Sequence, residues 1–445
     1  MKKKQRRPLS SFQIIFFGFL GVILLGSLLL MLPIASRGVG GTPFLDALFT
    51  ATSAVCVTGL VVHDTVSWWS PFGQAVILIL IQIGGMGVVT VAVAVALVSG
   101  RKIGLMQRST MQEAIAAPQV GGIIRFTSFI IKSAAILEIT GMLLLAPVFI
   151  RDFGLKKGVW YAVFHSISAF CNAGFDLMGA SQPYSSLTGY RADLPVNLII
   201  CALIITGGLG FLTWEDFKRN RLNFRKYRMQ SKVILSFTLG LLILPTLFFY
   251  FFEFNGPQWS GQERFLMAFF QSVTARTAGF NTADLTAMSQ ASQLLMIILM
   301  LIGGAPGSTA GGMKTTTLAV LAVSAWAVFH RREDADCFGR RIPEETVRYA
   351  AVVMMMYMTL FLAGGLFISC VEGLPAIDCL FETASAIATV GVTLGITPSL
   401  SMASHFVLII LMFFGRVGGL TIVYAAISGT HSTHSRMPRE KITVG

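Results

Sequence analysis

The chain has 445 residues, of which 54% are hydrophobic and 12% charged, and its net charge is +13. Soluble domains carry about 25% charged residues, so this composition excludes a water-soluble enzyme. The positive charge gives no case for nucleic-acid binding, because the Lys and Arg residues follow the alternation of a membrane topology, described below.

Apolar windows long enough to cross a bilayer recur along the whole chain. A spanning helix needs about 20 predominantly apolar residues. Six windows are uncharged, one holds Lys132 and Glu138, and the last holds Arg416. The eight predicted spans cover residues 12–32, 72–100, 128–150, 194–214, 233–252, 285–313, 349–371 and 403–428.

The basic residues predict the orientation of these spans. Of the 34 Lys and Arg residues, 25 lie in the N-terminal segment, alternate loops and the C-terminal tail, and six lie in the intervening loops. Because cytoplasmic loops are enriched in Lys and Arg, we expect both termini in the cytoplasm, with anionic membrane lipid as a partner of the basic loops.

Four segments at intervals near 110 residues share one pattern. Each begins with Phe and has Gly at its eleventh position, and the glycines are 115, 105 and 112 residues apart. The segments are FTATSAVCVTGL (49–60), FHSISAFCNAGF (164–175), FFQSVTARTAGF (269–280) and FETASAIATVGV (381–392). A fixed period of this kind indicates internal repeats.

Each segment follows an apolar span, is too short to cross the membrane and precedes a glycine-containing second span. Non-helical backbone at membrane depth is tolerated only where protein buries it or where it lines water. We therefore predict an all-α membrane protein: eight transmembrane helices in four helix–re-entrant pore loop–helix repeats, with pseudo-fourfold symmetry around one pore. Ordinary glycine-mediated helix packing is the alternative, and the fourfold coincidence of Phe and Gly argues against it.

The loops are the predicted ion site. Backbone carbonyls can replace the hydration shell of a cation, and glycine permits the positive φ and close packing that such a loop needs. The predicted K+ selectivity filter is formed by Val57, Thr58, Gly59, Leu60, Asn172, Ala173, Gly174, Phe175, Thr277, Ala278, Gly279, Phe280, Thr389, Val390, Gly391 and Val392.

The period divides the chain into four units and a tail. We expect repeat 1 with a cytoplasmic N-terminal tail at 1–100, repeat 2 at 101–217, repeat 3 at 218–330, repeat 4 at 331–430 and a cytoplasmic C-terminal tail at 431–445.

Residues 285–329 cannot form one straight helix, because it would extend about 68 Å at 1.5 Å per residue. Helix-breaking residues are concentrated in 303–314, so we predict an intramembrane gating loop there, with a static kink as the alternative. The predicted gate comprises Gly303, Gly304, Gly307, Ser308, Thr309, Gly311, Gly312, Lys314 and Arg416.

Arg416 lies in the middle of the last span, where an unpaired guanidinium facing lipid costs about 2.5–3.5 kcal/mol. Three roles stay open: a barrier to cations, an anchor for the carbonyls of the gating loop, or a structural ion pair. Lys314 either belongs to the gate or extends toward the cytoplasmic interface.

The sequence resembles the Trk/Ktr/HKT superfamily of potassium transporters, and most of all the membrane subunit of bacterial Ktr systems. The resemblance covers essentially the whole chain. It depends on VTGL (57–60), NAGF (172–175), TAGF (277–280), TVGV (389–392), GGAPGSTAGGMKTTT (303–317) and GRVGGLT (415–421).

The resemblance implies potassium uptake in a bacterial cytoplasmic (inner) membrane by a homodimer in which each chain has its own pore. It also implies control by a cytoplasmic RCK-type ring of nucleotide-binding regulatory subunits. This chain has no Walker A motif and no GxGxxG after a strand, so we expect no cofactor in it and nucleotide only through the partner. Glycine at position 59 favours potassium, since serine in the first repeat accompanies sodium preference in some plant members of the superfamily.

Three other functions are weighed against potassium uptake. The pore could pass sodium or couple sodium to potassium as a symporter. An intramembrane enzyme would need paired Asp residues, HExxH or a Ser/His pair at depth, and none is evident, so we predict no enzyme. An inverted-repeat transporter would have halves of opposite orientation, whereas these repeats run in one direction.

Overall fold

The computed structural model describes residues 10–38, 40–98, 104–115, 121–180, 182–419 and 421–422. Within these residues the fold is helical apart from one small antiparallel hairpin, β1 (Asp336–Cys337) with β2 (Arg340–Arg341). The prediction of a helical protein is therefore confirmed. The predicted tail at 431–445 and the end of the predicted span 403–428 lie outside the described residues.

Four stretches of the chain have the same order of elements: a long helix, a short helix, a loop and a further helix. The first contains α1 (Ser11–Leu30), α2 (Phe44–Val55) and α4 (Pro71–Met86). The second contains α7 (Ile123–Phe170) and α8 (Leu194–Gly208). The third contains α10 (Met229–Phe248), the π-helix η4 (Phe249–Glu253), α11 (Gly261–Thr274) and α12 (Gln290–Leu301). The fourth contains α14 (Glu344–Glu372), α15 (Ala376–Ile387) and α16 (Met402–Val417).

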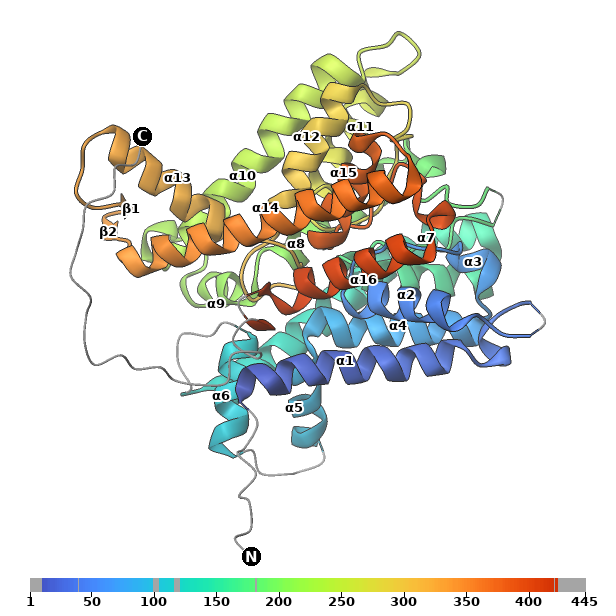
Figure 1. Cartoon of the computed structure of the whole chain (residues 1–445), viewed down its shortest axis with the longest axis horizontal. Coiled ribbons are helices and arrows are strands. Elements are labelled where there is room, and N and C mark those ends of the chain that lie inside the picture. Colours follow the sequence, from blue (N-terminus) through green and yellow to red (C-terminus); the bar gives the residue numbers. More distant parts are fainter. Residues whose placement is uncertain are drawn as a thin grey trace, which may run out of the picture.

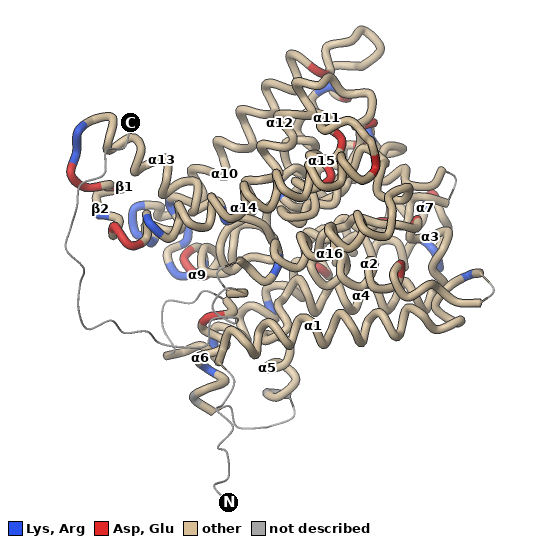
Figure 2. The backbone as a smooth tube through the Cα atoms, in the orientation of Figure 1, with Lys and Arg blue, Asp and Glu red and all other residues tan. Residues whose placement is uncertain are grey.

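Shorter elements connect these helices. They are η1 (Pro33–Ala35), α3 (Thr65–Trp68), α5 (Val88–Val98), α6 (Leu105–Ala114), η2 (Thr188–Tyr190), α9 (Phe211–Asn220), η3 (Phe224–Lys226), α13 (Thr315–Phe329) and η5 (Thr397–Ser399). Helices α1, α14 and α16 run side by side in Figure 1, and Figure 2 shows the Lys and Arg residues gathering around α6, α9 and the β1–β2 hairpin at one end of the molecule.

The second stretch differs in that its long and short helices are fused within α7. Gly154, at φ 75° and ψ 168°, breaks the helical conformation between the two parts. The short part, residues 155–170, therefore corresponds to α2, α11 and α15. Pro147 lies shortly before this break and also disfavours a continuous straight helix.

Two predicted spans, 72–100 and 194–214, are each bent into two helices. Helices α4 and α5 meet at 96°, and helices α8 and α9 meet at 95°. The glycine at each bend, Gly87 (φ 86°) or Gly210 (φ 83°), has a positive φ that no α-helix can include. Gly418 (φ 88°) ends α16 in the same way.

The count of eight spans stays a prediction. In the described part of the chain, α1, α7, α10 with η4, and α14 are long and apolar enough to cross a membrane. Counting each bent pair as one span gives six. Helices α12 and α16 contain only 12 and 16 residues.

A recurring carboxylate ties two of the long helices to the helices that return through the membrane. Glu253, at the end of η4, accepts hydrogen bonds from Ser289 and Ser292 at the start of α12 (2.6–3.3 Å). Glu372, at the end of α14, accepts from the equivalent pair at the start of α16, Ser401 and Ser404. A negative charge at a helix N-terminus is favourable, so each Glu both caps and positions the returning helix.

Glycines in the returning helices permit close contact with the short helices. A Cβ on Gly84 would overlap the carbonyl oxygen of Val55 at the end of α2. Gly207 lies equally close to the Phe170 carbonyl, and Gly415 to the Ile387 carbonyl. These three glycines therefore set the depth of three short helices.

We expect Gly84→Ala to destabilise the protein by about 1–3 kcal/mol, because a methyl group cannot enter this contact without moving α2. Gly21→Ala in α1 is the matched control, since nothing lies within 4 Å of a Cβ there. Thermal unfolding of the purified protein in detergent measures both effects. Equal melting temperatures for the two variants would contradict the packing role of Gly84.

Candidate functional site

The loops that follow α2, α7, α11 and α15 share an unusual backbone conformation. Their first residues have positive φ, namely Val57 (51°), Asn172 (56°), Thr277 (70°) and Thr389 (51°). The glycines two positions later also have positive φ, namely Gly59 (96°), Gly174 (70°), Gly279 (89°) and Gly391 (96°). Because residues with positive and negative φ alternate, successive carbonyls can face the same side of the loop.

Positive φ is strained for the non-glycine residues. A left-handed conformation is an outlier for β-branched side chains such as those of Val57, Thr277 and Thr389, and costs of order 1–3 kcal/mol at each position. The same strain at four equivalent positions marks the loops as a candidate functional site.

The four loops meet in a closed ring. A Cβ built on each glycine would lie against the carbonyl oxygen of the residue that precedes the glycine in another loop, at 2.6–2.8 Å in three cases and closer in the fourth. The contacts are Gly59 with Ala173, Gly174 with Ala278, Gly279 with Val390 and Gly391 with Thr58. The structure thus brings together segments from both ends of the chain, in chain order around one axis.

Hydroxyl groups hold each loop in this conformation. Ser53 Oγ accepts a hydrogen bond from the Gly59 amide (3.1 Å), and Ser385 Oγ accepts one from the Gly391 amide (3.0 Å). Ser168 Oγ donates to the Phe175 carbonyl at 2.7 Å. In the third loop the corresponding position is Val273, which has no hydroxyl, and the neighbouring Thr274 donates to the Phe280 carbonyl instead.

Buried oxygen atoms at the ring have no hydrogen-bond partner within the described part of the chain. They are Thr58 Oγ1, Asn172 Oδ1, Thr277 Oγ1 and Thr389 Oγ1. Buried polar atoms are nearly always paired, so each exception needs an explanation. The explanation that fits here is that these oxygen atoms are ligands of a bound cation or water molecule.

The helices aim their negative ends at the ring. Each of the four short helices ends directly before its loop, at Val55, Phe170, Thr274 and Ile387. A helix C-terminus is equivalent to roughly half a negative elementary charge, so the four together supply about two. This arrangement favours cations and disfavours anions at the ring.

A non-helical segment crosses one side of the ring. Helix α12 ends at Leu301 and α13 begins at Thr315, so the chain leaves the helical conformation where the glycines predict a break. Thr309 fastens the segment to the second loop: its amide donates to the Gly207 carbonyl (3.2 Å) and its Oγ1 donates to the Phe170 carbonyl (2.9 Å). Asn172 Nδ2 in turn donates to Thr309 Oγ1 at 3.0 Å.

The same segment reaches the fourth loop. The Gly312 amide donates to the Gly415 carbonyl at 3.0 Å, and a Cβ on Gly311 would overlap the Thr389 hydroxyl. These contacts are with the first residues of the loops, on the side away from Leu60 and Phe175. The segment therefore lies against the second and fourth loops on the side where the short helices end.

The remaining predicted gate residues shape this segment. The Gly303 amide donates to the Met313 carbonyl (2.8 Å), and the Gly304 carbonyl accepts from the Thr315 amide (3.0 Å). The Gly307 carbonyl accepts from the Phe211 amide (2.9 Å), which ties the segment to α9. Ser308 Oγ donates to the Ala305 carbonyl at 2.6 Å and stabilises the turn.

Arg416 links the segment to the first stretch of the chain. Its guanidinium donates to the carbonyls of Thr309, Gly84 and Gly85, the last at 3.0 Å. Within the described residues it has no carboxylate partner. Lys314 Nζ donates to the Ala310 carbonyl at 2.9 Å, so both predicted gate cations bind loop carbonyls.

Two features of the site were not found in the sequence. The Asn172–Thr309 hydrogen bond joins residues 137 positions apart, and no sequence pattern connects them. The bends at Gly87 and Gly210 left a signal, since each is the last glycine of a GGxG motif, but that motif was interpreted only as part of a span.

A family model described as TrkH, cation transport protein, matches residues 3–435. The chain belongs to this family. It is 39% identical to the potassium/sodium uptake protein NtpJ of Enterococcus hirae, over 100% of this chain and 99% of that protein. It is also 36% identical to the Ktr system potassium uptake protein B of Bacillus subtilis, over 97% of this chain and 96% of that protein.

The solved structure of the potassium transporter TrkH from Vibrio parahaemolyticus matches this structure with a TM-score of 0.72 at 20% identity, over 95% of this chain and 86% of that chain. At this identity the match shows the fold alone. The superfamily resemblance seen in the sequence is confirmed. Because TrkH family members and these relatives are transporters, the enzyme alternative is excluded.

We expect Arg416→Gln to raise basal cation flux through this TrkH family member several-fold, because it releases the crossing segment from Gly84 and Gly85. Rubidium flux into proteoliposomes measures the change. Arg37→Gln is the control, since Arg37 also donates to a backbone carbonyl, that of Trp69, which lies outside the segment. A flux no higher than that of the control would contradict the anchoring role.

Proposed function

We propose that the chain takes up potassium through a single pore, with the loops 57–60, 172–175, 277–280 and 389–392 as its selectivity filter. The closed ring of Gly59, Gly174, Gly279 and Gly391 supports this proposal most directly. Four carbonyl-bearing loops around one axis can replace the water around a dehydrated monovalent cation. The names of the relatives, potassium uptake and potassium/sodium uptake proteins, agree with this substrate.

The proposed architecture has eight transmembrane helices in four helix–re-entrant pore loop–helix repeats with pseudo-fourfold symmetry. In it, α12 and α16 each form part of a span, because their 12 and 16 helical residues are too few to cross the membrane alone. The boundaries 1–100, 101–217, 218–330 and 331–430 belong to this proposal, as does the bacterial inner membrane with both termini in the cytoplasm. The gathering of Lys and Arg at one end in Figure 2 supports that orientation.

Residues 303–314 act as the gate in this proposal. The structure has them hydrogen-bonded to the second and fourth stretches of the chain and anchored to the first through Arg416. Arg416 adds a positive charge on this side of the ring, which opposes the negative helix ends. Opening requires the segment to break the hydrogen bonds of Thr309 and to move away from the axis.

Control by a cytoplasmic partner is part of the proposal. Ktr system potassium uptake proteins are named as components of a system, which suggests a second component for this chain as well. We infer that an RCK-type ring of nucleotide-binding subunits contacts the basic loops, and that the chain forms a homodimer with one pore in each subunit. Nucleotide would then act only through the partner.

Sodium is the second candidate ion, as a substrate or as a coupling ion, because one relative is named a potassium/sodium uptake protein. Rubidium uptake into proteoliposomes, with competition by potassium and by sodium, distinguishes the candidates. Potassium uptake predicts that potassium competes at lower concentration than sodium. Equal competition, or acceleration of rubidium uptake by sodium, favours the sodium alternatives.

Gly59→Ser tests the filter itself. A Cβ at this position, which has φ 96°, would lie 2.6 Å from the Ala173 carbonyl oxygen and would displace a carbonyl of the ring. We expect the preference for rubidium over sodium to fall on the order of tenfold, equivalent to about 1.4 kcal/mol. Gly240→Ser in α10, where nothing lies within 4 Å of a Cβ, controls for the added hydroxyl. An unchanged preference in Gly59→Ser would exclude the first loop from the filter.

A further inference from the structure

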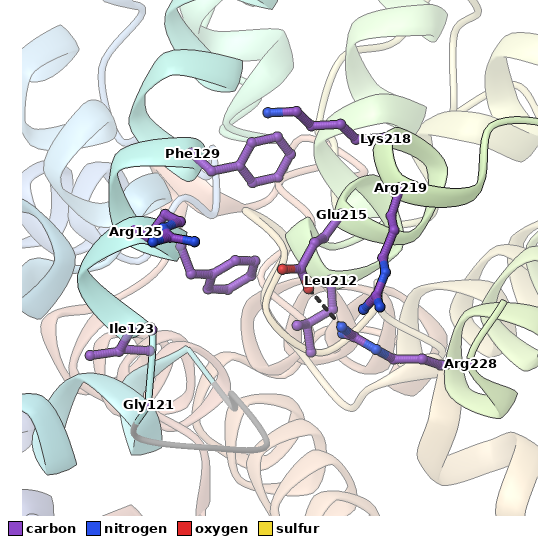
Figure 3. A pocket seen from close by; sticks show the side chains of 11 residues that line it. Gly121, Ile123, Arg125, Phe129, Leu212, Glu215, Lys218, Arg219 and Arg228 are labelled. Carbon is purple, nitrogen blue, oxygen red and sulfur yellow. Dashed lines mark hydrogen bonds and ion pairs between the residues drawn. The ribbon is translucent and has the colours of Figure 1, made fainter.

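A basic pocket lies away from the ring, between the start of α7 and the segment that joins α8 to α10. Its volume is about 530 Å3, which falls within the usual range for ligand sites. Figure 3 shows that Arg125 and Phe129 face it from α7, and that Lys218, Arg219 and Arg228 face it from the other side, with Glu215 between them.

The charges in this pocket are not balanced. Glu215 pairs with Arg228 at 2.8 Å, and Asp216 also lies 3.5 Å from Arg228. In the part of the chain that the structure describes, Arg125, Lys218 and Arg219 have no ion pair. Nη1 of Arg228 is buried and has no hydrogen-bond partner there. Three uncompensated cations and an unused buried donor favour an anionic ligand.

The first turn of α7 adds to this potential. Gly121 and Gly122 line the pocket, and Gly122 is the N-cap of α7. The cap has no side-chain hydrogen bond, and the first turn contains no acidic residue. The positive end of the helix therefore faces the same space as the basic side chains.

Apolar side chains lie on the same elements as the cations. Lys218 Nζ lies 5.0 Å from the centre of the Phe129 ring. On α9 and just beyond it, Phe217, Leu222 and Phe224 are 47%, 86% and 41% exposed. Since α9 bends by 95° from α8, it runs across the direction of the spans. Exposed apolar side chains on a basic helix of this orientation are typical of the membrane–water interface.

We propose that this pocket binds the phosphate of an anionic phospholipid, whose acyl chains lie over Phe129 and the exposed apolar side chains on α9 and just beyond it. Basic pockets between membrane helices on the basic face recognise such headgroups. A soluble phosphate would gain the charge contacts alone, whereas a lipid gains the apolar contacts as well. The inference does not depend on the identity of the transported ion.

Native mass spectrometry of the purified full chain tests the proposal, with phosphatidylglycerol and phosphatidylcholine as probes. We expect the double variant Arg125→Gln/Arg219→Gln to bind phosphatidylglycerol on the order of 30-fold more weakly than the unaltered chain, because it removes two of the three cations without an ion pair. The control Arg225→Gln/Lys226→Gln removes the same charge from η3, whose residues do not line the pocket, and should change binding by less than twofold.

A variant that is expected to bind the lipid more tightly excludes misfolding as the explanation. Glu215→Gln removes the acid that competes for Arg228, so we expect it to bind phosphatidylglycerol more tightly than the unaltered chain. Phosphatidylcholine binding should stay the same in every variant.

Several results would overturn the proposal. Equal losses in the two double variants would mean that general surface charge, rather than this pocket, attracts the lipid. Displacement of phosphatidylglycerol by equimolar glycerol 3-phosphate would identify a soluble anion as the ligand. Unchanged lipid binding in Arg125→Gln/Arg219→Gln, together with loss of a co-purifying cytoplasmic protein, would assign the pocket to a protein partner.

Discussion

Four stretches of non-helical backbone packed against one another among apolar helices impose the constraint on which the rest of the structure depends. Apolar surroundings offer no hydrogen bonds, so every amide and carbonyl of these loops must be paired within the protein or face the pore that we propose. The hydroxyls of Ser53, Ser168 and Ser385 meet this requirement for individual loop groups. Gly84, Gly207 and Gly415 also contribute, because they let the short helices pack closely enough for their loops to contact one another.

The electrostatics of the site follow from the same geometry. Four helix C-termini place about two negative elementary charges at the ring without any acidic side chain. Helix ends and carbonyls attract a cation without titrating, whereas the charge of a carboxylate would depend on pH. Arg416 then opposes this potential from one side only. In the gate that we propose, movement of this side chain would change the barrier while the ring stays intact.

The sequence predicted the parts of the structure that repeat. The four ring glycines could be found because the same loop occurs four times, and each time its segment has a Phe at the first position and a Gly at the eleventh. They are Gly59, Gly174, Gly279 and Gly391. The bends at Gly87 and Gly210 were missed because a glycine for positive φ and a glycine for close packing look identical in an apolar run. The contact of Asn172 with Thr309 was beyond prediction, because it depends on how the third stretch folds across the second.

The third stretch departs from the others in a way that suits a gate. In the first, second and fourth stretches, a helix glycine packs on the carbonyl at the end of its own short helix. In the third, the nearest atoms to a Cβ on Gly303 belong to Gly311, Gly312 and Met313 of the crossing segment itself. The close approach at Gly303 is therefore within the crossing segment and not to the end of α11. This difference supports the gate that we propose, since movement of the segment would leave the close contacts at Gly84, Gly207 and Gly415 in place.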